Sequence, residues 1–385
     1  MKHHHLLSAC ALAALTLTLT GCRSSQNVST ALFERTEVFG PGDDGSKFYR
    51  IPALATAADG SLIAIADKRW DNLGDLPEHI DAVCRRSTDN GHTWSAPVTI
   101  AGEGTRVGYG DVAVVLDEQN GQLLTLITSG TGLWQSRRGT DEVQKILVSI
   151  SKDNGQTWSQ PRDITPQIYG PGCPDAERSQ WHGAFVSSGS ALQLSTGRLM
   201  AVTPIRKSAD WGGKLATYVI YSDDHGLSWQ VSENPGDEDG DESKVVELEN
   251  GDVLMSIRNR HQGTRKFSIS HDGGRTWSEP WLQHDITEPA CNGDIISYQP
   301  RRGQRMLLHT IPFDAKVRRN VSLLGSTDDG KTWTLRRSFG KQMAAYSSLT
   351  VLKDGTIGCL IEEGQYDDHG FNIYFYRLSP DWLLQ

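Results

Sequence analysis

The sequence has few cysteines, no cluster of basic residues and no long stretch of helical periodicity. The formal net charge is −9 at pH 7, and no basic stretch offsets it, so nucleic acid is excluded as the expected partner. None of the six cysteines forms a C-x-x-C pair, which argues against a zinc site. We therefore predict neither a metal site nor a cofactor, and a fold that is not helical.

The first two dozen residues have the pattern of an export signal. Lys2 supplies a positive charge, and the apolar stretch 6–20 that follows is too short to span a membrane comfortably. The stretch runs into the letters LTGC, ending at Cys22, which resemble the lipobox of bacterial lipoproteins. In that family the chain is cut before the cysteine, which is then acylated. The resemblance implies a signal peptide at 1–21 and lipid attachment at Cys22.

A polar tether at 22–32 would then join the lipid to the folded domain. The resemblance implies an exported bacterial lipoprotein at the outer membrane, on its periplasmic or cell-surface side. The alternative is a simple secretory signal with a chance cysteine.

Four cysteines remain after the export signal. Cys84 and Cys359 lie in apolar runs typical of strands, which predicts that they pack as small buried hydrophobes. Cys173 and Cys291 lie in expected loops, where an exported chain could oxidise them. The sequence leaves the redox state of these two open.

One eight-residue turn, Ser-x-Asp-x-Gly-x-(Thr/Ser)-Trp, occurs five times. The copies are Ser87–Trp94, Ser151–Trp158, Ser222–Trp229, Ser270–Trp277 and Ser326–Trp333. In such a turn the short Asp accepts hydrogen bonds from its own backbone, and the Gly supplies a positive φ. The Trp covers the turn with apolar area. The five box aspartates resemble catalytic residues by their number, but the turn geometry predicts that they are structural.

A second repeat precedes the first, because a turn ending in Gly introduces a short apolar strand six times. These glycines are Gly60, Gly121, Gly197, Gly251, Gly303 and Gly355. Each unit thus has four strands, with a Gly turn between the first two and a Trp-ending turn between the last two. Six such units predict an all-β, six-bladed β-propeller over 33–385, without an internal linker. The stretch 33–39 would complete the sixth blade beside 372–378 and remove exposed edges.

The two ends of this propeller differ in character. The Gly turns and Trp-ending turns are short and repetitive, so their end is predicted to be structural. The other end carries long, irregular loops, which is where binding and catalysis concentrate. Eight unusual polar residues fall at this second end: Arg50, Asp75, Asp111, Glu242, Arg258, Arg318, Tyr346 and Glu362.

Together these motifs resemble the exo-α-sialidases, or neuraminidases, of the bacterial and animal type, across essentially the whole mature length. The repeated boxes alone are only moderately specific, because other propellers carry them. The more specific matches are FYRIP around Arg50, the pair Arg69 and Asp75 six residues apart, E-x-x-V-V-E-L from Glu242, Arg258 sixteen residues later, R-x-N at Arg318 and A-Y-S around Tyr346.

The resemblance implies a retaining hydrolysis of terminal sialic acid. Arg50, Arg258 and Arg318 would bind the substrate carboxylate, for which guanidinium groups are well suited. A neutral phenol avoids the repulsion that a carboxylate nucleophile would meet, so Tyr346 would attack while Glu242 draws its proton.

The remaining residues have supporting parts in the same scheme. Asp75 would protonate the leaving oxygen and later activate water. Arg69 would help to bind the substrate, and Asp111 would line the pocket. Glu362 would orient Arg50. The expected partners are sialylated glycans, glycoproteins or gangliosides, and the expected state is a monomer.

Several assignments have rivals in the sequence. Spacing favours Arg258 over Arg260, Arg318 over Arg319, Glu242 over Glu247, and Asp75 over Asp71 and Asp81. Trp181 or Trp211 is a weaker candidate for lining the pocket. The acidic run 237–243 resembles a calcium loop, although a solvated loop is the more common explanation.

Two other functions remain open at this point. A trans-sialidase or an intramolecular variant differs from a hydrolytic sialidase only in its acceptor-side loops. A single sequence does not show which of these reactions those loops support. A non-catalytic propeller that binds glycans would not need Asp75, Glu242 and Tyr346, so their presence favours the enzyme.

Overall fold

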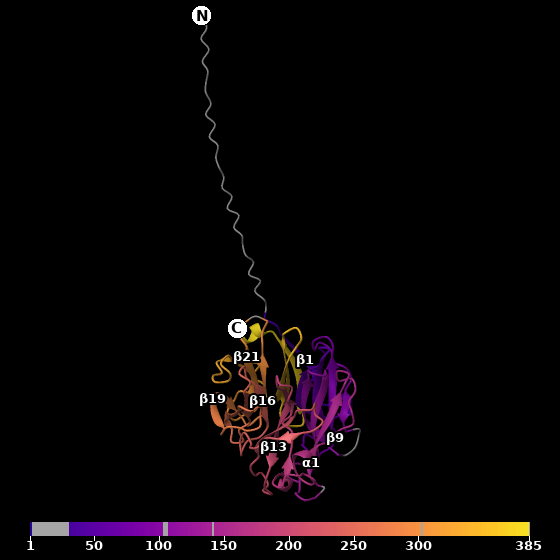
Figure 1. Cartoon of the computed structure of the whole chain (residues 1–385). Helices are drawn as coiled ribbons and strands as arrows, with labels where there is room; N and C mark the ends of the chain where they lie inside the picture. The colour runs from indigo at the N-terminus through magenta and orange to yellow at the C-terminus, as the bar shows by residue number, and fades with distance from the viewer. Residues whose placement is uncertain (2–30, 103–106, 141, 302, 385) are drawn as a thin grey trace. The chain divides into compact units, whose positions relative to one another are not determined.

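The chain from residue 31 onward folds, in a computed structural model, into six sheets arranged as the blades of a β-propeller (Figure 1). The predicted all-β, six-bladed architecture is confirmed. The signal peptide predicted at 1–21, Cys22 and nearly all of the tether at 22–32 lie outside the described residues. The structure describes residues 1, 31–102, 107–140, 142–301 and 303–384.

The first three blades follow one another along the chain. The first contains β2 (Phe48–Thr56), β3 (Leu62–Arg69), β4 (Ile80–Ser87) and β5 (Val98–Ala101). The second contains β6 (Tyr109–Asp117), β7 (Gln122–Gly130), β8 (Gln144–Ser151), β9 (Arg162–Asp163) and the added β11 (Gly189–Ser190). The third contains β10 (Gly183–Ala184), β12 (Leu192–Gln193), β13 (Leu199–Arg206), β14 (Ala216–Ser222) and β15 (Gln230–Val231).

The last three blades are more regular. The fourth contains β16 (Ser243–Glu247), β17 (Val253–Ile257), β18 (Gly263–Ser270) and β19 (Trp281–Glu288). The fifth contains β20 (Asp294–Tyr298), β21 (Met306–Pro312), β22 (Val321–Ser326) and β23 (Leu335–Ser338). The sixth contains β24 (Ala344–Val351), β25 (Ile357–Gly364), β26 (Phe371–Leu378) and β1 (Phe33–Phe39). Short helices are α1 (Thr165–Ile168), α2 (Pro380–Leu384) and the 3₁₀ turns Asp43–Gly45 and Arg178–Gln180.

The ring closes as predicted, because β1 forms the outer strand of the sixth blade. It pairs antiparallel with β26, from Phe33 opposite Leu378 to Phe39 opposite Ile373. The first strand of the folded domain is thus bonded to the last, which covers the edge that β26 would otherwise expose.

The inner strand of the third blade departs from the expected regular unit. Its ends, β10 and β12, pair with β13, but between them β11 crosses over and pairs in parallel with β6. Gly189, at the crossing, has φ +110°, and a Cβ there would lie 3.0 Å from Lys244 Cε. A larger residue would meet both backbone strain and this contact, so the crossing depends on glycine.

The five Trp-ending turns share the hydrogen bonds that their Ser and Asp side chains make, whereas the bond from Trp Nε1 to the Gly carbonyl occurs in the first, third and fifth turns. In the first, Ser87 Oγ donates to Asp89 Oδ1 (2.8 Å) and accepts from the Gly91 amide (2.9 Å). The amide and hydroxyl of Thr93 donate to the two oxygens of Asp89, at 2.9 and 2.6 Å. Trp94 Nε1 closes the turn on the Gly91 carbonyl (3.2 Å). The carboxylate is fully engaged by its own turn, which is the predicted structural function.

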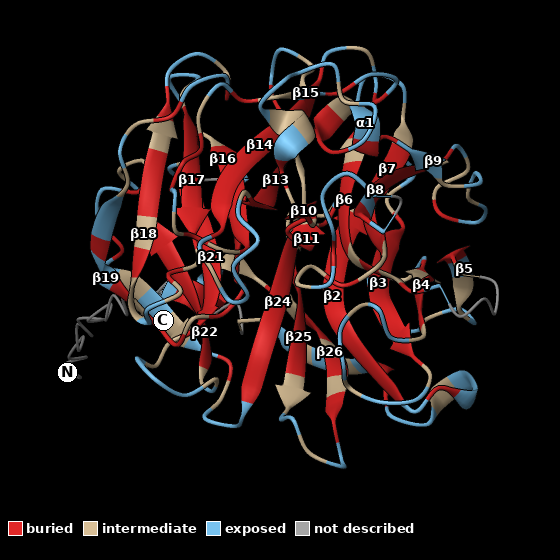
Figure 2. Ribbon diagram, turned by 90° about the horizontal axis from the view of Figure 1, so that it is seen from below, coloured by how far each residue is buried: buried red, intermediate tan, exposed pale blue. Residues whose placement is uncertain are grey.

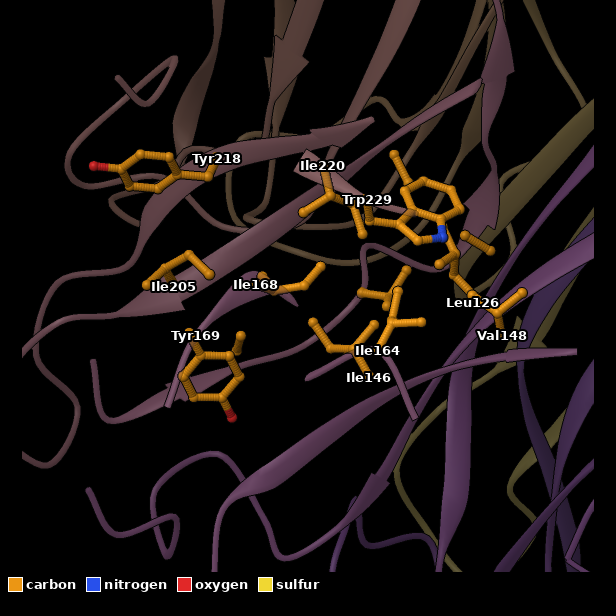
Figure 3. Close-up of a cluster of buried hydrophobic side chains, with 14 of the residues drawn as sticks. Leu126, Ile146, Val148, Ile164, Ile168, Tyr169, Ile205, Tyr218, Ile220 and Trp229 are labelled. Atoms are coloured by element: carbon orange, nitrogen blue, oxygen red, sulfur yellow. The ribbon is translucent and has the colours of Figure 1, made fainter. Parts of the chain in front are cut away.

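Buried apolar residues lie along the strands, and exposed residues concentrate in the loops (Figure 2). The core between the second and third blades is typical (Figure 3). There Ile146 and Val148 from β8, with Ile168 from α1, pack against Ile220 from β14 and Trp229 from the third turn. Each blade thus buries one face against the next.

The four described cysteines are free thiols. Cys84 and Cys359 are buried, as predicted, and Trp158 Nε1 donates to Cys84 Sγ at 3.3 Å. Cys291 is also buried and Cys173 is half-buried, so neither forms the bridge that the sequence left open.

Candidate active site

A cavity of about 350 Å³ opens between blades at the end away from the Trp-ending turns. Six of the residues predicted from the sequence line it: Asp75, Asp111, Glu242, Arg258, Arg318 and Tyr346. They come from five different blades, and no residue of the Trp-ending turns is among the lining residues. Sequence segments far apart therefore converge on one polar site.

Three inner strands reach the cavity through an irregularity in their pairing. The register of β2 shifts between Arg50 and Ala53, and that of β6 shifts between Gly110 and Ala113. The register of β24 shifts within 344–347, at Tyr346. Two cavity residues in these segments have left-handed backbone, Ile51 (φ 60°) and Asp111 (φ 49°). Such bulges redirect side chains, and strained backbone of this kind concentrates at functional sites.

The Tyr346 hydroxyl is hydrogen-bonded to a carboxylate, Glu242, and to a guanidinium group, Arg258. The hydroxyl donates to Glu242 Oε2 at 2.6 Å and accepts from Arg258 Nη1 at 3.1 Å. Arg258 Nη1 also donates to the same Glu242 oxygen. Burial raises the pKa of Tyr346 well above its ordinary value, Glu242 raises it further, and Arg258 opposes the shift. The phenol is therefore neutral at neutral pH, with a carboxylate placed to receive its proton.

Two further guanidinium groups flank the Tyr346 ring. Arg318 Cζ lies 5.6 Å from the ring centroid and Arg50 Cζ lies 5.2 Å from it. Arg318 Nη2 donates to the Ala290 carbonyl at 3.0 Å, which fixes its direction. The cations surround the tyrosine and create a site that attracts an anion.

Glu362 holds Arg50 in a two-pronged ion pair. Arg50 Nε and Nη2 donate to the two carboxylate oxygens at 3.0 and 2.8 Å, and both side chains are fully buried. The same carboxylate accepts the amides of Ile51 (2.6 Å) and Tyr346 (3.1 Å). Glu362 thus connects the arginine with the backbone that carries the tyrosine.

Arg50 itself does not line the cavity, in contrast to Arg258 and Arg318. Its third guanidinium nitrogen, Nη1, donates to the hydroxyl of Tyr366, a residue of the loop between β25 and β26. Tyr366 lines the cavity and is 55% exposed. All three guanidinium nitrogens of Arg50 therefore have hydrogen-bond partners, on Glu362 and Tyr366.

Asp75 is held at the cavity by Arg69. Arg69 Nη2 donates to Asp75 Oδ1 at 2.8 Å and to the buried Asp67 Oδ2 at 3.1 Å. The Asp75 side chain is 75% exposed, whereas Arg69 is buried behind it. Partial desolvation favours the neutral acid, but Arg69 and Arg50 outweigh it and lower the pKa of Asp75. Arg69 contacts the candidate acid and does not itself line the cavity.

Asp111 adds a second carboxyl group to the same wall. Its amide donates to Asp67 Oδ1 at 3.1 Å. Burial raises the pKa of Asp67 to about 7, although Arg69 opposes this. Burial, with Asp67 and Asp75 nearby, raises the pKa of Asp111 well above its ordinary value. The neutral form of the Asp111 carboxyl is therefore favoured relative to an exposed aspartate.

The comparisons with known proteins agree with this geometry. Residues 60–359 match the protein family described as BNR repeat-like domain. The chain belongs to that family. The sialidase of Micromonospora viridifaciens is 33% identical over 98% of this chain, which spans 59% of that protein. The resemblance to sialidases predicted from the sequence is confirmed.

Solved structures give the same result. The Hadza microbial sialidase Hz136 has a TM-score of 0.79 and 28% identity, covering 90% of this chain and 69% of that one. The intramolecular trans-sialidase from Ruminococcus gnavus has a TM-score of 0.75 at 20% identity, covering 90% of this chain and 98% of that one, a likeness in fold alone. The chain spans 59% and 61% of the lengths of the Micromonospora and Bacteroides fragilis sialidases that it matches.

Within this BNR repeat-like fold, the rival residues lie elsewhere. Arg319 pairs with Asp314 and is half exposed. Arg260 bonds the carbonyls of Gly212 and Gly213. Glu247 accepts the amide and hydroxyl of Ser195 near the Gly turns.

The two rivals of Asp75 also have other partners. Asp71 lies 3.7 Å from His79, and Asp81 accepts from Trp70 Nε1 at 2.9 Å. Neither lines the cavity.

The acidic run 237–243 is held by basic side chains. Asp237 pairs with Lys266 at 2.6 Å, and Asp239 lies 3.6 Å from Arg260. Among the described residues, no group of three or more His, Cys, Asp or Glu side chains is arranged to hold a metal ion.

Several cavity residues were not predicted from the sequence. Trp181 is buried in the core against Tyr218, whereas Trp134 lines the cavity and packs on the exposed Trp211, with ring centroids 6.1 Å apart. Trp134 and Tyr366 both lie in loops between the second and third strands of a blade, so aromatic residues in those loops were the available signal.

The side-chain oxygen of Gln144 in the cavity wall has no hydrogen-bond partner among the described residues. Gln144 itself is buried. The apolar side chains of Leu133, Phe185 and Leu215 line the same cavity. This side of the cavity suits a substituent with a polar group beside an apolar one.

Proposed function

We propose that this chain is a retaining exo-α-sialidase, which hydrolyses terminal α-ketosidically linked sialic acid from glycoconjugates with Tyr346 as the nucleophile. The observation that carries the proposal is the hydrogen bond from the Tyr346 hydroxyl to Glu242, in a cavity flanked by arginines. The sialidase relatives support the substrate class.

The charges of the cavity explain why sialic acid would bind. Its anomeric carbon carries a carboxylate, which Arg258 and Arg318 can bind directly. Arg50 becomes available to the same carboxylate when the hydroxyl of Tyr366 moves from its guanidinium group. The hydroxyls of the sugar can form hydrogen bonds with the Asp111 carboxyl group, which lines the cavity.

The first displacement needs the phenol and two carboxyl groups. Glu242 accepts the proton of Tyr346 as the phenol oxygen attacks the anomeric carbon, which forms a covalent sialyl-enzyme. A neutral nucleophile approaches the substrate carboxylate without the repulsion that a carboxylate would meet. Asp75 protonates the departing glycosidic oxygen.

The binding of an anionic substrate prepares Asp75 for this task. In the free enzyme the arginines lower the pKa of Asp75, which favours its ionised form. The substrate carboxylate offsets the same positive charges, so the pKa of Asp75 rises when substrate binds. In the second displacement Asp75 removes a proton from water, which attacks the anomeric carbon and restores the original configuration.

The experiment follows sialyllactose with α2,3 and α2,6 linkages by proton NMR. The proposal predicts free sialic acid whose first-formed anomer is α, because two displacements retain configuration. An anhydro sugar would indicate intramolecular transfer, and a sialylated acceptor would indicate a trans-sialidase. Binding of sialyllactose without formation of any product would indicate a non-catalytic, glycan-binding propeller.

Two further proposals concern the state of the protein. We infer lipid attachment at Cys22 after removal of 1–21, with the mature enzyme at the outer membrane. We also propose that the enzyme acts as a monomer.

A further inference from the structure

A buried ion pair lies beneath the candidate site and takes no part in the chemistry proposed above. Arg265 in β18 and Glu288 at the end of β19 are both fully buried, with Nη1 and Oε2 3.1 Å apart. Neither residue lines the cavity. Breaking a buried pair of this kind leaves an uncompensated charge, so its surroundings are held in one arrangement.

Glu288 uses its two oxygens to hold two separate backbone segments. Oε1 accepts the amide of Asn259 at 2.6 Å, and Oε2 accepts the amide of Cys291 at 3.1 Å. Arg265 holds the second segment from the other side, because its Nη1 donates to the Cys291 carbonyl at 2.8 Å. Its Nε donates to Ser256 Oγ at 2.9 Å. Hydrogen bonds with a charged partner are the stronger ones.

Both segments lead directly to the arginines of the site. Asn259 follows Arg258, whose guanidinium group bonds Tyr346 and Glu242. Ala290 precedes Cys291, and its carbonyl accepts from Arg318 Nη2 at 3.0 Å. Ala290 has a left-handed backbone (φ 54°), which is strained for a residue with a Cβ and persists only when its surroundings impose it.

The second segment also supports the tyrosine. Cys291 belongs to a small buried cluster with Ile51, Ala345, Tyr346 and Phe371. Three features of the site therefore depend on one pair: the backbone beside Arg258, the carbonyl that directs Arg318, and the packing near Tyr346.

We propose that Arg265 and Glu288 are a positioning pair, which fixes Arg258 and Arg318 for the substrate carboxylate without touching the substrate. The inference rests on the sialidase function proposed above. Its consequence is that loss of the pair weakens binding of the anion more than it slows the chemical step.

The principal variant is Glu288→Gln, which has nearly the same shape. In either orientation its amide nitrogen would face a donor, the Asn259 amide or the Arg265 Nη1 and Cys291 amide pair, so one of the two held segments would shift. We expect KM for sialyllactose to rise about tenfold while kcat changes less than about threefold, which separates binding from chemistry. The inhibition constant of a 2,3-unsaturated sialic acid analogue, which carries the carboxylate, should rise by the same factor.

A matched control removes an ion pair at the other end of the propeller. Asp354 pairs with Arg377 at 2.6 Å, near the last Gly turn. Asp354→Asn should lower thermal stability and leave KM and the inhibition constant unchanged. A double-mutant cycle supplies the second check, because Glu288→Gln added to Arg318→Lys should raise KM by less than about twofold.

The outcomes separate this inference from the function on which it rests. If the wild-type protein forms no product from sialyllactose, the proposed sialidase function itself is contradicted. An active wild type with unchanged KM in Glu288→Gln, or fully additive effects in the cycle, would overturn the positioning pair alone. If Glu288→Gln does not fold, Arg265→Met with Glu288→Gln removes the unpaired guanidinium and should fold with the same raised KM. Failure of both to fold would show that the pair serves only stability, and would also overturn the inference.

Discussion

The Tyr346 hydroxyl donates a 2.6 Å hydrogen bond to Glu242 Oε2, although the two residues lie on the fourth and sixth blades, 104 positions apart in sequence. Glu242 also accepts from Arg258, and Glu362 holds the Tyr346 amide at 3.1 Å. A phenol with a base on one side and a fixed backbone on the other is prepared for nucleophilic attack. The following predictions test the parts of this arrangement.

The first prediction concerns Asp75 as general acid. Asp75→Ala should slow hydrolysis of sialyllactose by about a hundredfold or more, because its leaving alcohol needs a proton. Aryl sialosides, whose phenolate leaves unaided, should lose less than about tenfold. Asp71→Ala, in the same loop but away from the cavity, is the control. Equal losses with both substrates would assign the acid to another residue.

The pH dependence follows from the lowered pKa of Asp75. In the free enzyme Asp75 is ionised at neutral pH and gains its proton only as pH falls. Therefore kcat/KM for substrates with poor leaving groups should increase as pH falls through the weakly acidic range, while that for aryl sialosides changes less. Steady-state kinetics with both substrates from pH 4 to pH 8 would measure this, and identical profiles would contradict it.

The second prediction concerns Glu362. Glu362→Gln leaves the fully buried Arg50 without a charged partner, which should cost about 3 kcal/mol in the free energy of unfolding. Urea unfolding measures this loss, and kcat/KM should fall as well, because the same carboxylate holds the Tyr346 amide. The neighbouring Glu363 pairs with the 43% exposed Arg35, so Glu363→Gln should cost less. Equal costs for the two variants would contradict the account.

The repeats explain why so much of the fold was predictable. Each Trp-ending turn needs its own Ser, Asp and Gly for local hydrogen bonds, so most of its sequence is fixed by the turn itself. Even the residue before the glycine has a positive φ in every copy, and it is Asn, His, Gly or Asp. Local requirements of this kind are visible in sequence.

The parts that were not predictable depend on contacts between distant segments. The crossing of β11 onto β6 is set by packing near Lys244, and the sequence around Gly189 shows only small residues. The burial of Arg50 behind Tyr366, and the position of Arg69 behind Asp75, likewise depend on loops from separate parts of the chain. Motifs identified these arginines but not which of them line the cavity.

The third prediction concerns a turn rather than the site. Hydrogen bonds from Thr93 and Ser87 lower the pKa of Asp89 to about 2, so its ionised form stabilises the folded state. A lowered pKa gives stability that is present above the ordinary value near 4 and is lost as pH falls toward 2. Asp89→Asn should lower the melting temperature at pH 7, and the difference from wild type should shrink on acidification. A difference independent of pH would contradict this.

The fourth prediction concerns the amino terminus. If Cys22 is acylated, the wild-type protein should sediment with membranes and partition into detergent. Cys22→Ser should move the enzyme to soluble fractions without changing its kcat or KM, because the site lies in the folded domain. Retention of the serine variant in membranes would contradict lipid attachment at this residue.

The central claim is that Tyr346 is the nucleophile, and a fluorinated substrate tests it most directly. A 3-fluorosialyl fluoride slows turnover of the covalent intermediate, so the enzyme should gain the mass of one fluorosialyl group. Peptide mapping should place that group on Tyr346. The Tyr346→Phe variant, which keeps Arg258 and Arg318, should still bind the unsaturated analogue and remain unlabelled. An adduct on any other residue, or labelling of the phenylalanine variant, would contradict the account.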